Sequence, residues 1–464
     1  MQGIWQSHVA TLTVAFLFLG ASSPLVHAQP ATTIQLPVFG IAIDADGVIE
    51  VKEFADVDGS IRAKRLAAAK GAVPGSVAAV SPLRKVALSR LEKAIAARQA
   101  AGQPLEDAMI HLAGLSRVQF VFLYPDSQEV VIAGPAEGWV ADASGRAIGI
   151  ATGQPPMRLE DLAVALRAYA PGSANKPFVG CTIDPRQEGL ARMAAFQKTV
   201  PATVPQAQRE AIAARIAIGS RQALGSADVR VFGIAPETHL AQVLVEADYR
   251  MKRIGIGLEP PPVKMVTFLG ALGSVRQLSL QRWWFQPDYD ALRATDDGLA
   301  VEFVGPGVQL LGEDKAIGPD GKLLNSAAAP NPASELFTTS FTRKYPEIAA
   351  ASPVYSQLRQ GVDLLVAAAW LRKHDAYGRV NWKPRLLLDE ATLPTKTAAV
   401  PKTVECVVNA VWKGNRLLAP AGGGVSILAD DALQPERIKA DEGGKLAKRR
   451  GEQSMPAGEK WWWD

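Results

Sequence analysis

Strand-like and helix-like segments alternate between residues 178 and 254, and this alternation constrains the fold more than any other feature of the sequence. Residues 178–183 and 229–234 have the apolar pattern of strands. Asp184-Pro185 begins a helical stretch between them, because proline fits the first helical position. Residues 236–254 then carry apolar side chains at helical spacing, namely Leu240, Val243, Leu244, Ala247, Met251 and Ile254. The pattern predicts a mixed α/β fold of the α+β type.

Turn signals and composition divide the chain into five predicted segments. Asp46-Gly47 between two alternating apolar runs predicts a hairpin, and Pro74 and Pro82 interrupt an Ala-rich helical stretch after it. The end of the chain is charged, Gly-rich and poor in apolar residues, which predicts disorder. The segments are a signal peptide (1–28), the hairpin with Ala-rich helices (29–104), a β-rich module closed by a helix (105–175), a larger central α/β domain with a helical hairpin and C-terminal strands (176–428), and a disordered tail (429–464).

The first residues have the pattern of a cleavable signal peptide. Residues 9–20 form an apolar run too short to span a bilayer, and Val26-His27-Ala28 suits signal peptidase, which would cut between Ala28 and Gln29. The stretch before the apolar run lacks Lys and Arg, which departs from the usual pattern. There is no cysteine for lipid attachment, and the best later candidate for a membrane span, 362–371, has only ten residues. We therefore expect an exported protein, periplasmic or secreted, with no transmembrane segment once the signal is removed.

Net charge limits the classes of partner, and the cysteine content allows one disulfide. The formal net charge is +4 and charged residues are 21% of the chain, which argues against nucleic acid as a partner. The two cysteines, Cys181 and Cys406, lie in apolar, strand-like stretches. In an oxidising compartment they could form a disulfide, and the alternative is two separate buried thiols.

No catalytic or metal motif can be recognised. The sequence lacks Gly-x-Ser-x-Gly, His-Glu-x-x-His, Cys-x-x-Cys and a phosphate loop, and His111, His239 and His374 have no partner at motif spacing. The Asp-Gly sequences at 44–47 and 56–59 are incomplete as calcium loops and are predicted to be turns. We expect no metal and no cofactor, whereas catalytic residues, and whether the protein is an enzyme at all, stay unknown.

One candidate binding surface lies on the predicted helix 236–254. Asp248, Tyr249, Lys252 and Arg253 form a basic and aromatic cluster that could bind an acidic ligand or a neighbouring domain. The alternative is a solvated helix face, because acidic residues precede basic ones at i,i+4 spacing, as in Asp248 and Lys252.

A second candidate follows in Trp283, Trp284 and Asp288. Consecutive aromatic residues on a strand point to alternating faces, so one of them could be exposed and bind a sugar or a partner chain. The alternative is that Trp283 and Phe285 fill the core while the helical hairpin, predicted at residues 332–349 and 353–374, covers Trp284.

Several long phrases resemble a known family. They are FVGCTIDPRQEGLARM, DVRVFGI, HLAQVLVEADYRMKRIGIGLEP, RWWFQPDYDAL and DGLAVEFVGPGVQLLGED, together with VVIAGPAEGWVADASGRAIGI and LEDLAVALRAY. Over roughly residues 105–370 the chain is similar to an exported protein family of planctomycete bacteria, domain of unknown function 1598. The resemblance implies a Gram-negative-type cell envelope and places Cys181, the Tyr249–Arg253 face and Trp283-Trp284 in one domain. It implies no particular chemistry.

Two functions remain open at the level of sequence. The leading hypothesis is a non-enzymatic envelope protein that binds or scaffolds, with an envelope polymer or a protein as its partner. The alternative is a hydrolase of envelope polymers or peptides, with a site around Asp248, Lys252 and Asp288. A common cavity lined by the Tyr249–Arg253 face and Trp283-Trp284 would support a single binding face made of both clusters.

Overall fold

The computed structural model describes residues 38–43, 49–54, 60, 64, 67 and 75–464, with gaps inside the last range. The gaps are residues 143, 174–176, 202–203, 273–278, 318–322, 326–330, 400, 410–420, 453–455, 457 and 459. The predicted signal peptide and the Asp-Gly turns at 44–47 and 56–59 therefore lie outside the described residues.

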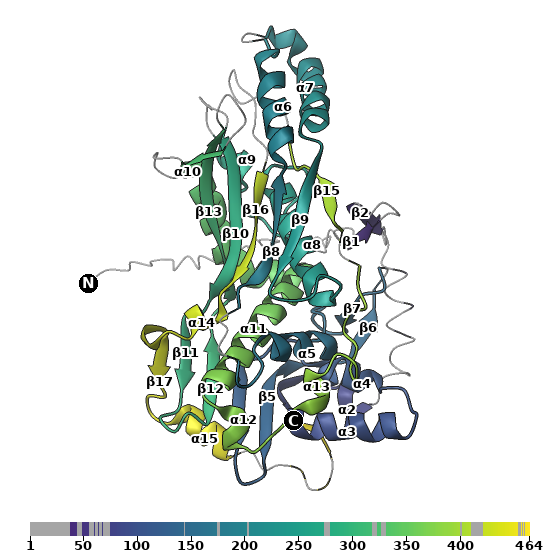
Figure 1. Cartoon of the computed structure of the whole chain (residues 1–464), viewed down its shortest axis with the longest axis vertical. Coiled ribbons are helices and arrows are strands. Elements are labelled where there is room, and N and C mark those ends of the chain that lie inside the picture. Colours follow the sequence, from purple (N-terminus) through teal and green to yellow (C-terminus); the bar gives the residue numbers. More distant parts are fainter. Residues whose placement is uncertain are drawn as a thin grey trace, which may run out of the picture. The chain divides into compact units, whose positions relative to one another are not determined.

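The described strands form two seven-stranded sheets and two hairpins (Figure 1). The first sheet, which we call the central sheet, has the order β14 (Leu323–Asn325), β13 (Gly307–Ile317), β10 (Ser279–Asp288), β16 (Ala421–Ile427), β8 (Val179–Pro185), β9 (Ser226–Phe232) and β15 (Thr403–Glu405). The second, which we call the strapped sheet, has the order β17 (Ile438–Ala440), β11 (Ala291–Ala294), β12 (Ala300–Val304), β4 (Phe120–Tyr124), β5 (Glu129–Ala136), β3 (Ser81–Ala87) and β18 (Trp462–Trp463). The hairpins are β1 (Val38–Ile43) with β2 (Ile49–Phe54), and β6 (Trp139–Ala141) with β7 (Ala147–Gly149).

The helices fall into long and short ones. The long ones are α3 (Leu88–Ala100), α5 (Leu159–Ala168), α6 (Gln187–Lys198), α7 (Arg209–Leu224), α8 (His239–Gly255), α10 (Pro332–Ala351) and α11 (Pro353–Lys373). The short ones are α2 (Gly75–Ala78), α4 (Asp107–Ile110), α9 (Phe268–Ala271), α12 (Ala376–Arg379), α13 (Arg385–Leu388), α14 (Ala429–Ala432) and α15 (Lys445–Gly451), with 3₁₀ turns η1 (Leu112–Gly114), η2 (Gln206–Gln208) and η3 (Pro435–Arg437). The mixed α/β class is confirmed.

Local sequence signals explain the helices of the central region. The Thr238 hydroxyl accepts a hydrogen bond from the Ala241 amide at 3.2 Å and so caps α8, which begins at His239, three residues after Pro236. The Asn331 side chain accepts from the Ala333 amide and begins α10, and the break before Pro353 separates α10 from α11, as the helical hairpin predicted. These helices are the scaffold for one face of the central sheet.

The two faces of the central sheet differ in burial. Along β10, residues 281, 283 and 285 are buried whereas 282, 284 and 286 are half-buried, and β8 alternates in the same way over residues 181–184. The buried side chains face α8, α10 and α11, where Trp283 contacts Phe337 and Phe285 contacts Phe341. We call the other face, which carries Thr182, Asp184, Arg230, Arg282 and Trp284, the open face.

The strapped sheet is buried on both faces. Residues 120–123 of β4 and 129–134 of β5 are consecutively buried, which is the pattern of a strand covered on two sides. One side packs against α3 and α5. The other side contains Phe120, Phe122 and Val131 in a cluster completed by Leu446 of α15 and Trp463 of β18.

The predicted disordered tail, residues 429–464, needs correction in its described part. It forms α14, η3, β17, α15 and β18. Helix α14 packs against α11, whereas β17 lies at one edge of the strapped sheet, α15 on one of its faces and β18 at the opposite edge. The segment has few apolar residues, but Leu433, Leu446 and Trp461–Trp463 are buried against the rest of the chain. A composition poor in apolar residues predicts disorder because such a segment cannot bury a core of its own. This segment instead packs on a core that the sheet supplies. We call residues 429–464 the strap.

Residues 81–87 also differ from the prediction, because they form β3 inside the stretch expected to be helical. Strand β3 pairs with β5 on one side and β18 on the other, and Val86 and Ala87 are fully buried. Tertiary pairing therefore overrides the local Ala- and Lys-rich composition.

The sheets also combine segments that the sequence suggested were separate. Strands β4 and β5 come from the predicted β-rich module, β11 and β12 from the predicted central domain, and β17 and β18 from the strap. Strand β16 inserts between β10 and β8, so the last predicted strands pack into the central sheet.

Candidate functional site

Glycines shape the middle of the open face. Strand β16 carries Gly422, Gly423 and Gly424, and it lies between β10, to which it is parallel, and β8, to which it is antiparallel. A Cβ atom at Gly424 would lie 2.0 Å from the Cys181 carbonyl oxygen, and one at Gly423 would lie 2.0 Å from the Trp283 carbonyl oxygen. Only glycine permits so close an approach on both sides of a strand. This feature was not predicted, although the Gly-Gly-Gly run at 422–424 is a sequence signal for it.

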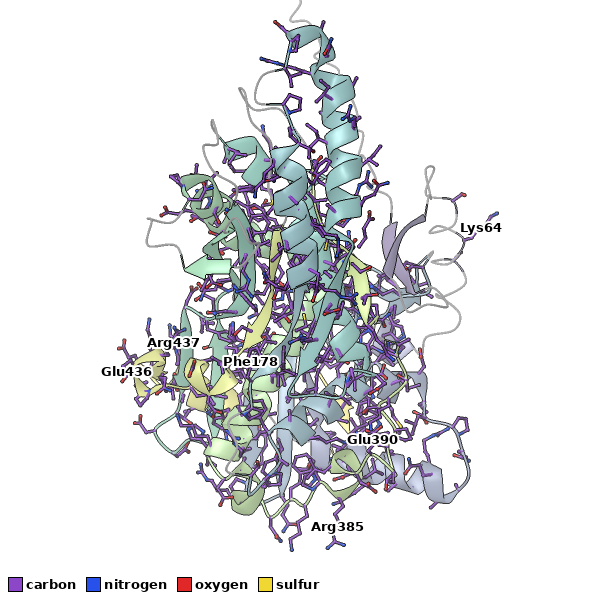
Figure 2. The ribbon with its side chains drawn as sticks, turned by 45° about the horizontal axis from the view of Figure 1, so that its top comes forward. Lys64, Phe178, Arg385, Glu390, Glu436 and Arg437 are labelled. Atoms are coloured by element: carbon purple, nitrogen blue, oxygen red, sulfur yellow. The ribbon has the colours of Figure 1, made fainter. Side chains whose placement is uncertain are left out.

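Aromatic rings lie over Gly424 of β16 and over Gly180 of the neighbouring strand β8, and we call these glycines the glycine floor. A Cβ at Gly424 would come within 3.0 Å of Cζ3 of Trp284, and a Cβ at Gly180 within 3.1 Å of Cζ of Phe178 (labelled in Figure 2). The Phe178 ring also contacts Phe232 of β9 at a centroid distance of 5.5 Å. All three aromatic side chains are half-buried. We call Phe178, Phe232 and Trp284 the aromatic shelf.

A row of charged side chains crosses the sheet beside the shelf. The Arg282 guanidinium donates to Asp184 of β8 at 3.1 Å and to Glu313 of β13 at 3.0 Å, and its Cζ lies 4.8 Å from the Trp284 ring centroid. The bridge to Asp184 passes over Gly422, where a Cβ would lie 2.7 Å from Oδ1 of Asp184. Arg282 thus holds Trp284 in place by a cation–π contact while both of its carboxylate partners keep part of their surface in solvent.

A polar cleft of about 490 Å³ continues the open face beyond Asp184. Arg186 pairs with Asp228 there at 2.7 Å, and Arg230 is exposed beside Thr182. The cleft is lined by Thr182, Asp184, Pro185, Arg186, Gln187, Glu188, Asp228 and Arg230. Its acidic and basic groups are nearly balanced, so it offers many hydrogen-bonding groups without a strong field of either sign.

The predicted cluster on α8 does not form one surface. Lys252 and Asp248 are fully buried and form an ion pair of 2.7 Å, and the Lys252 ammonium also donates to the carbonyls of Ile183 and Gly423. Burial raises the pKa of Asp248 to about 6, against the opposing effect of Lys252. The expectation of a solvated face is therefore wrong for this pair, which instead fixes α8 beneath β8 and β16.

Tyr249 and Arg253 lie elsewhere, on a pocket of about 260 Å³. The Tyr249 hydroxyl donates to the carbonyl of Glu405 at 3.3 Å, and the Arg253 guanidinium lies 5.9 Å from the Tyr249 ring centroid. Neither Trp283 nor Trp284 lines this pocket. The hypothesis of a common cavity for the two clusters is wrong.

The second predicted cluster is divided by the sheet. Trp283 is fully buried and donates to the Ser334 hydroxyl at 2.9 Å, whereas Trp284 points to the open face. The helical hairpin covers Trp283 and Phe285, and it does not cover Trp284 as the core alternative expected. Asp288 lies near the end of β10, where burial raises its pKa and its charged neighbours are Arg437 and Asp290. It therefore does not join Asp248 and Lys252 in one site.

Both cysteines are free and buried. Cys181 lies on β8, and Cys406 follows β15, with β9 between these two strands. Burial raises the pKa of the Cys406 thiol to about 12 and that of Cys181 well above its ordinary value. Of the two alternatives, a disulfide or two separate buried thiols, the structure has the second.

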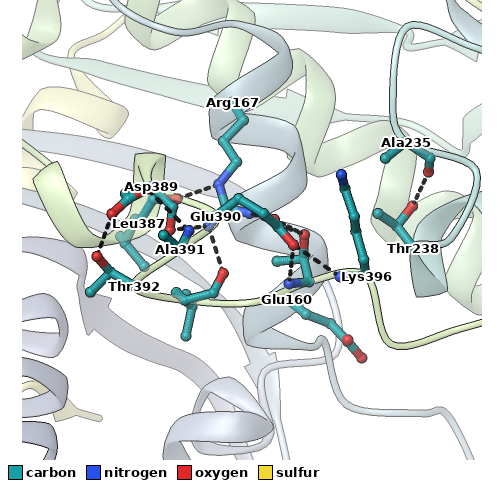
Figure 3. A network of polar contacts seen from close by, with 12 residues as sticks. Glu160, Arg167, Ala235, Thr238, Leu387, Asp389, Glu390, Ala391, Thr392 and Lys396 are labelled. Carbon is teal, nitrogen blue, oxygen red and sulfur yellow. Dashed lines mark hydrogen bonds and ion pairs between the residues drawn. The ribbon is translucent and has the colours of Figure 1, made fainter.

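Two other polar clusters tie helices of the fold to neighbouring segments. Arg167 of α5 donates to the carbonyls of Leu387 and Leu393 at 2.9 and 2.8 Å and pairs with Glu390, which holds the loop after α13 (Figure 3). His239 of α8 contacts Asp161 of α5 at 2.9 Å in the interior. In the described parts of the chain, no group of three His, Cys, Asp or Glu side chains could hold a metal ion, and no helix is long and apolar enough to span a membrane.

One family model matches part of the chain. Residues 181–268 match the model of a family described as a protein of unknown function, DUF1598. The match runs from β8 through α8 to the start of α9, so it includes Thr182, Asp184 and Arg230 of the open face. No curated protein and no solved structure matches the chain. The region that resembled the family in sequence thus contains a domain of unknown function.

Proposed function

We propose that the chain is an exported binding protein that holds an extended carbohydrate chain on the open face of its central sheet. The observation that carries the proposal is the aromatic shelf beside a row of paired charges. Trp284 and Phe178 lie over glycines and are half-buried on the face that the helices leave open. Aromatic residues mostly fill cores, so rings held at a surface by a glycine floor favour a ligand-binding role.

The chemistry of the shelf suits a sugar ring. The C–H groups of a pyranose pack against an aromatic face, while its hydroxyls exchange hydrogen bonds with charged and polar side chains at the rim. Arg282 and Asp184 lie beside Trp284, and Thr182 and Arg230 lie across β16 from it. A row of aromatic and polar groups across several strands fits an extended polymer better than a small compact molecule.

The charge balance favours a ligand that is rich in hydroxyls over a polyanion. Arg186, Arg230 and Arg282 stand against four carboxylates, those of Asp184, Glu188, Asp228 and Glu313. A nucleic acid or strongly acidic polymer would require an excess of basic groups along its path. The nearly neutral surface instead supports binding to uncharged segments of an envelope polymer.

The ion pairs formed by the acidic groups favour binding over bond cleavage. Asp248 is enclosed in an ion pair beneath the sheet, Asp184 and Glu313 both pair with Arg282, and Asp228 pairs with Arg186, which leaves Glu188 as the one carboxylate of the cleft without an ion pair in the described residues. Glycoside hydrolysis generally uses two carboxyl groups that flank the scissile bond, so a single unpaired carboxylate favours binding. We therefore propose a binding protein without catalytic residues on this face.

Export is a separate part of the proposal and rests on residues 1–28, whose apolar run and Val26-His27-Ala28 sequence suit signal peptidase. Mass spectrometry of the protein from its native envelope fraction is expected to find Gln29 at the amino terminus. Met1 retained on the mature protein would contradict export by this route.

Affinity electrophoresis tests the binding function. The wild-type chain is expected to migrate more slowly in gels that contain a neutral β-linked polysaccharide, such as cellulose ether or glycol chitin, than in plain gels. Trp284→Ala should remove the retardation, while Ile218→Ala, an exposed apolar position on α7, should leave it intact. Equal retardation of all three, or none with any polysaccharide, would contradict the proposal.

A further inference from the structure

The edge of the strapped sheet is completed by a very short strand from far along the chain. Strand β18 pairs antiparallel with β3, with Trp462 opposite Val86 and Trp463 opposite Lys85, and the Ala87 amide donates to the Trp461 carbonyl at 2.8 Å. Adding a short extended segment to a sheet edge is a recognised mode of peptide recognition, in which the main chain gives affinity and side-chain sites give specificity.

The specificity sites on β3 are already defined. Arg84 is fully buried and donates to the carbonyls of Val77, Ala79 and Ala113 at 3.0, 3.0 and 2.7 Å, which fix its guanidinium without neutralising its charge. Its remaining donors reach the Asp464 carboxylate at 2.8 and 3.3 Å. Arg84 therefore forms a fixed receptor for one carboxylate at this edge.

The tryptophans fill the rest of the edge. The Trp462 ring lies 4.9 Å from the Arg84 guanidinium and 4.4 Å from the Lys460 ammonium, and Trp463 packs with Phe120 and Phe122. The three tryptophan side chains are between 6% and 9% exposed. Arg90 also binds the carbonyls of Pro456, Gly458 and Lys460, so a second guanidinium holds the approach to β18.

We propose that the β3 edge is a peptide-binding groove for the sequence of residues 460–464, and that it accepts this segment from a second copy of the chain as well as from its own strap. The charge complementarity argues for this occupant, because Arg84 and Lys85 meet Asp464. An empty groove would leave the Arg84 guanidinium without its carboxylate and without the Trp462 ring beside it, together with an uncovered strand edge, and these features favour refilling by an identical segment. The short β18 holds the strap by local contacts that an equal segment in trans can reproduce.

A peptide titration tests the groove. A chain lacking residues 461–464 is expected to bind the pentapeptide Lys-Trp-Trp-Trp-Asp saturably, with one peptide per chain, in fluorescence anisotropy. A peptide that carries Asn at the position of Asp464 should bind at least about tenfold more weakly, because it loses the charged partner of Arg84. The composition-matched peptide Lys-Trp-Asp-Trp-Trp should not saturate. Equal binding of all three peptides, or no binding by the folded shortened chain, would overturn the groove.

The full-length chain tests the partner and covers the case in which the shortened chain does not fold. Two differently tagged full-length copies are expected to co-purify after joint incubation, and excess pentapeptide should suppress the mixed pairs. Asp464→Ala in both copies should reduce them, whereas Lys448→Ala, an exposed position on α15, should not. Absence of mixed pairs, or mixed pairs unaffected by both the pentapeptide and Asp464→Ala, would overturn the second copy as partner.

Discussion

The two seven-stranded sheets of this molecule differ in how their faces are covered. In the strapped sheet, Leu446 of α15 and the Trp463 side chain of the edge strand β18 pack on the side that α3 and α5 leave free, and the middle strands are buried on both sides. In the central sheet the helices cover one side, and the other presents half-buried rings and paired charges.

The difference shows what each sheet requires from its residues. A sheet covered on both sides needs apolar residues at consecutive positions, as in Phe120–Leu123. The central sheet packs one side against helices and seats Trp284 over Gly424 and Phe178 over Gly180 on the other. The open face of the central sheet is therefore the surface on which we propose carbohydrate binding, whereas both faces of the strapped sheet are taken up by the fold.

Adjacent tryptophans on β10 provide the sharpest test of the difference between a covered and an open face. Trp283→Ala is expected to lower the free energy of unfolding by about 3–5 kcal/mol, because it empties a fully buried site. Trp284→Ala should cost only about 1 kcal/mol or less, because its side chain is half-buried at the surface. Chemical denaturation of both variants measures this, and similar losses in the two would mean that the open face is structural.

The buried ion pair under the central sheet predicts a pH dependence. Because burial raises the pKa of Asp248 from 3.8 to about 6, the folded state binds this proton more tightly than the unfolded state. The stability that this bound proton contributes is fully present below about pH 4 and is lost as the pH rises through 6. The free energy of unfolding should therefore fall by about 3 kcal/mol over this range. Denaturation curves from pH 4 to 7 should show this component in the wild type. The component should be absent in Asp248→Asn, and identical slopes in both would contradict the assignment.

The glycine floor predicts a smaller loss. Gly424→Ala places a Cβ against the Cys181 carbonyl and near the Trp284 ring, so we expect it to cost about 1–3 kcal/mol and to weaken carbohydrate binding. Gly451→Ala, where no atom lies within 4 Å of the added Cβ, is the matched control and should stay within about 1 kcal/mol of wild type. If the two glycines tolerate alanine equally well in thermal denaturation, the close approach of β8 and β16 is not required.

The smallest expected effect concerns the two thiols, whose reactivity should differ between the folded and the unfolded protein. Burial raises the pKa values of Cys181 and Cys406, so neither should react with a thiol reagent at pH 8 in the folded protein. Both should react after unfolding without a reductant. Intact mass that shows two hydrogens fewer than the reduced chain would instead indicate a disulfide.

Local patterns predicted much of the central region. Helical spacing placed α8 within three residues of its observed start, and the proline at 353 separated α10 from α11. The alternation of β10 placed Trp283 and Phe285 on one side, which is where the structure has them. These features depend on neighbours in sequence, and sequence patterns report such features well.

The remaining features depend on residues far apart in the chain. Nothing local to Ser81–Ala87 reveals that it pairs with β5 and β18, and nothing local to Trp461–Trp463 reveals the core on which they pack. The aromatic shelf requires β16 to insert between β10 and β8, which brings Gly424 beside Trp284. Likewise, Asp248 and Lys252 looked solvated on their helix because the carbonyls of Ile183 and Gly423 come from other strands.

Calorimetric titration with a neutral oligosaccharide tests the central claim most directly. The hexasaccharide matched to the polysaccharide that retards the wild-type chain in gels should be titrated into the wild type, Trp284→Ala and Ile218→Ala at equal concentration. We predict saturable binding to the wild type and to Ile218→Ala, and at least about a tenfold weaker Kd for Trp284→Ala, because one stacked ring is lost. An unchanged Kd in a folded Trp284→Ala protein would contradict the assignment of the open face as the binding surface.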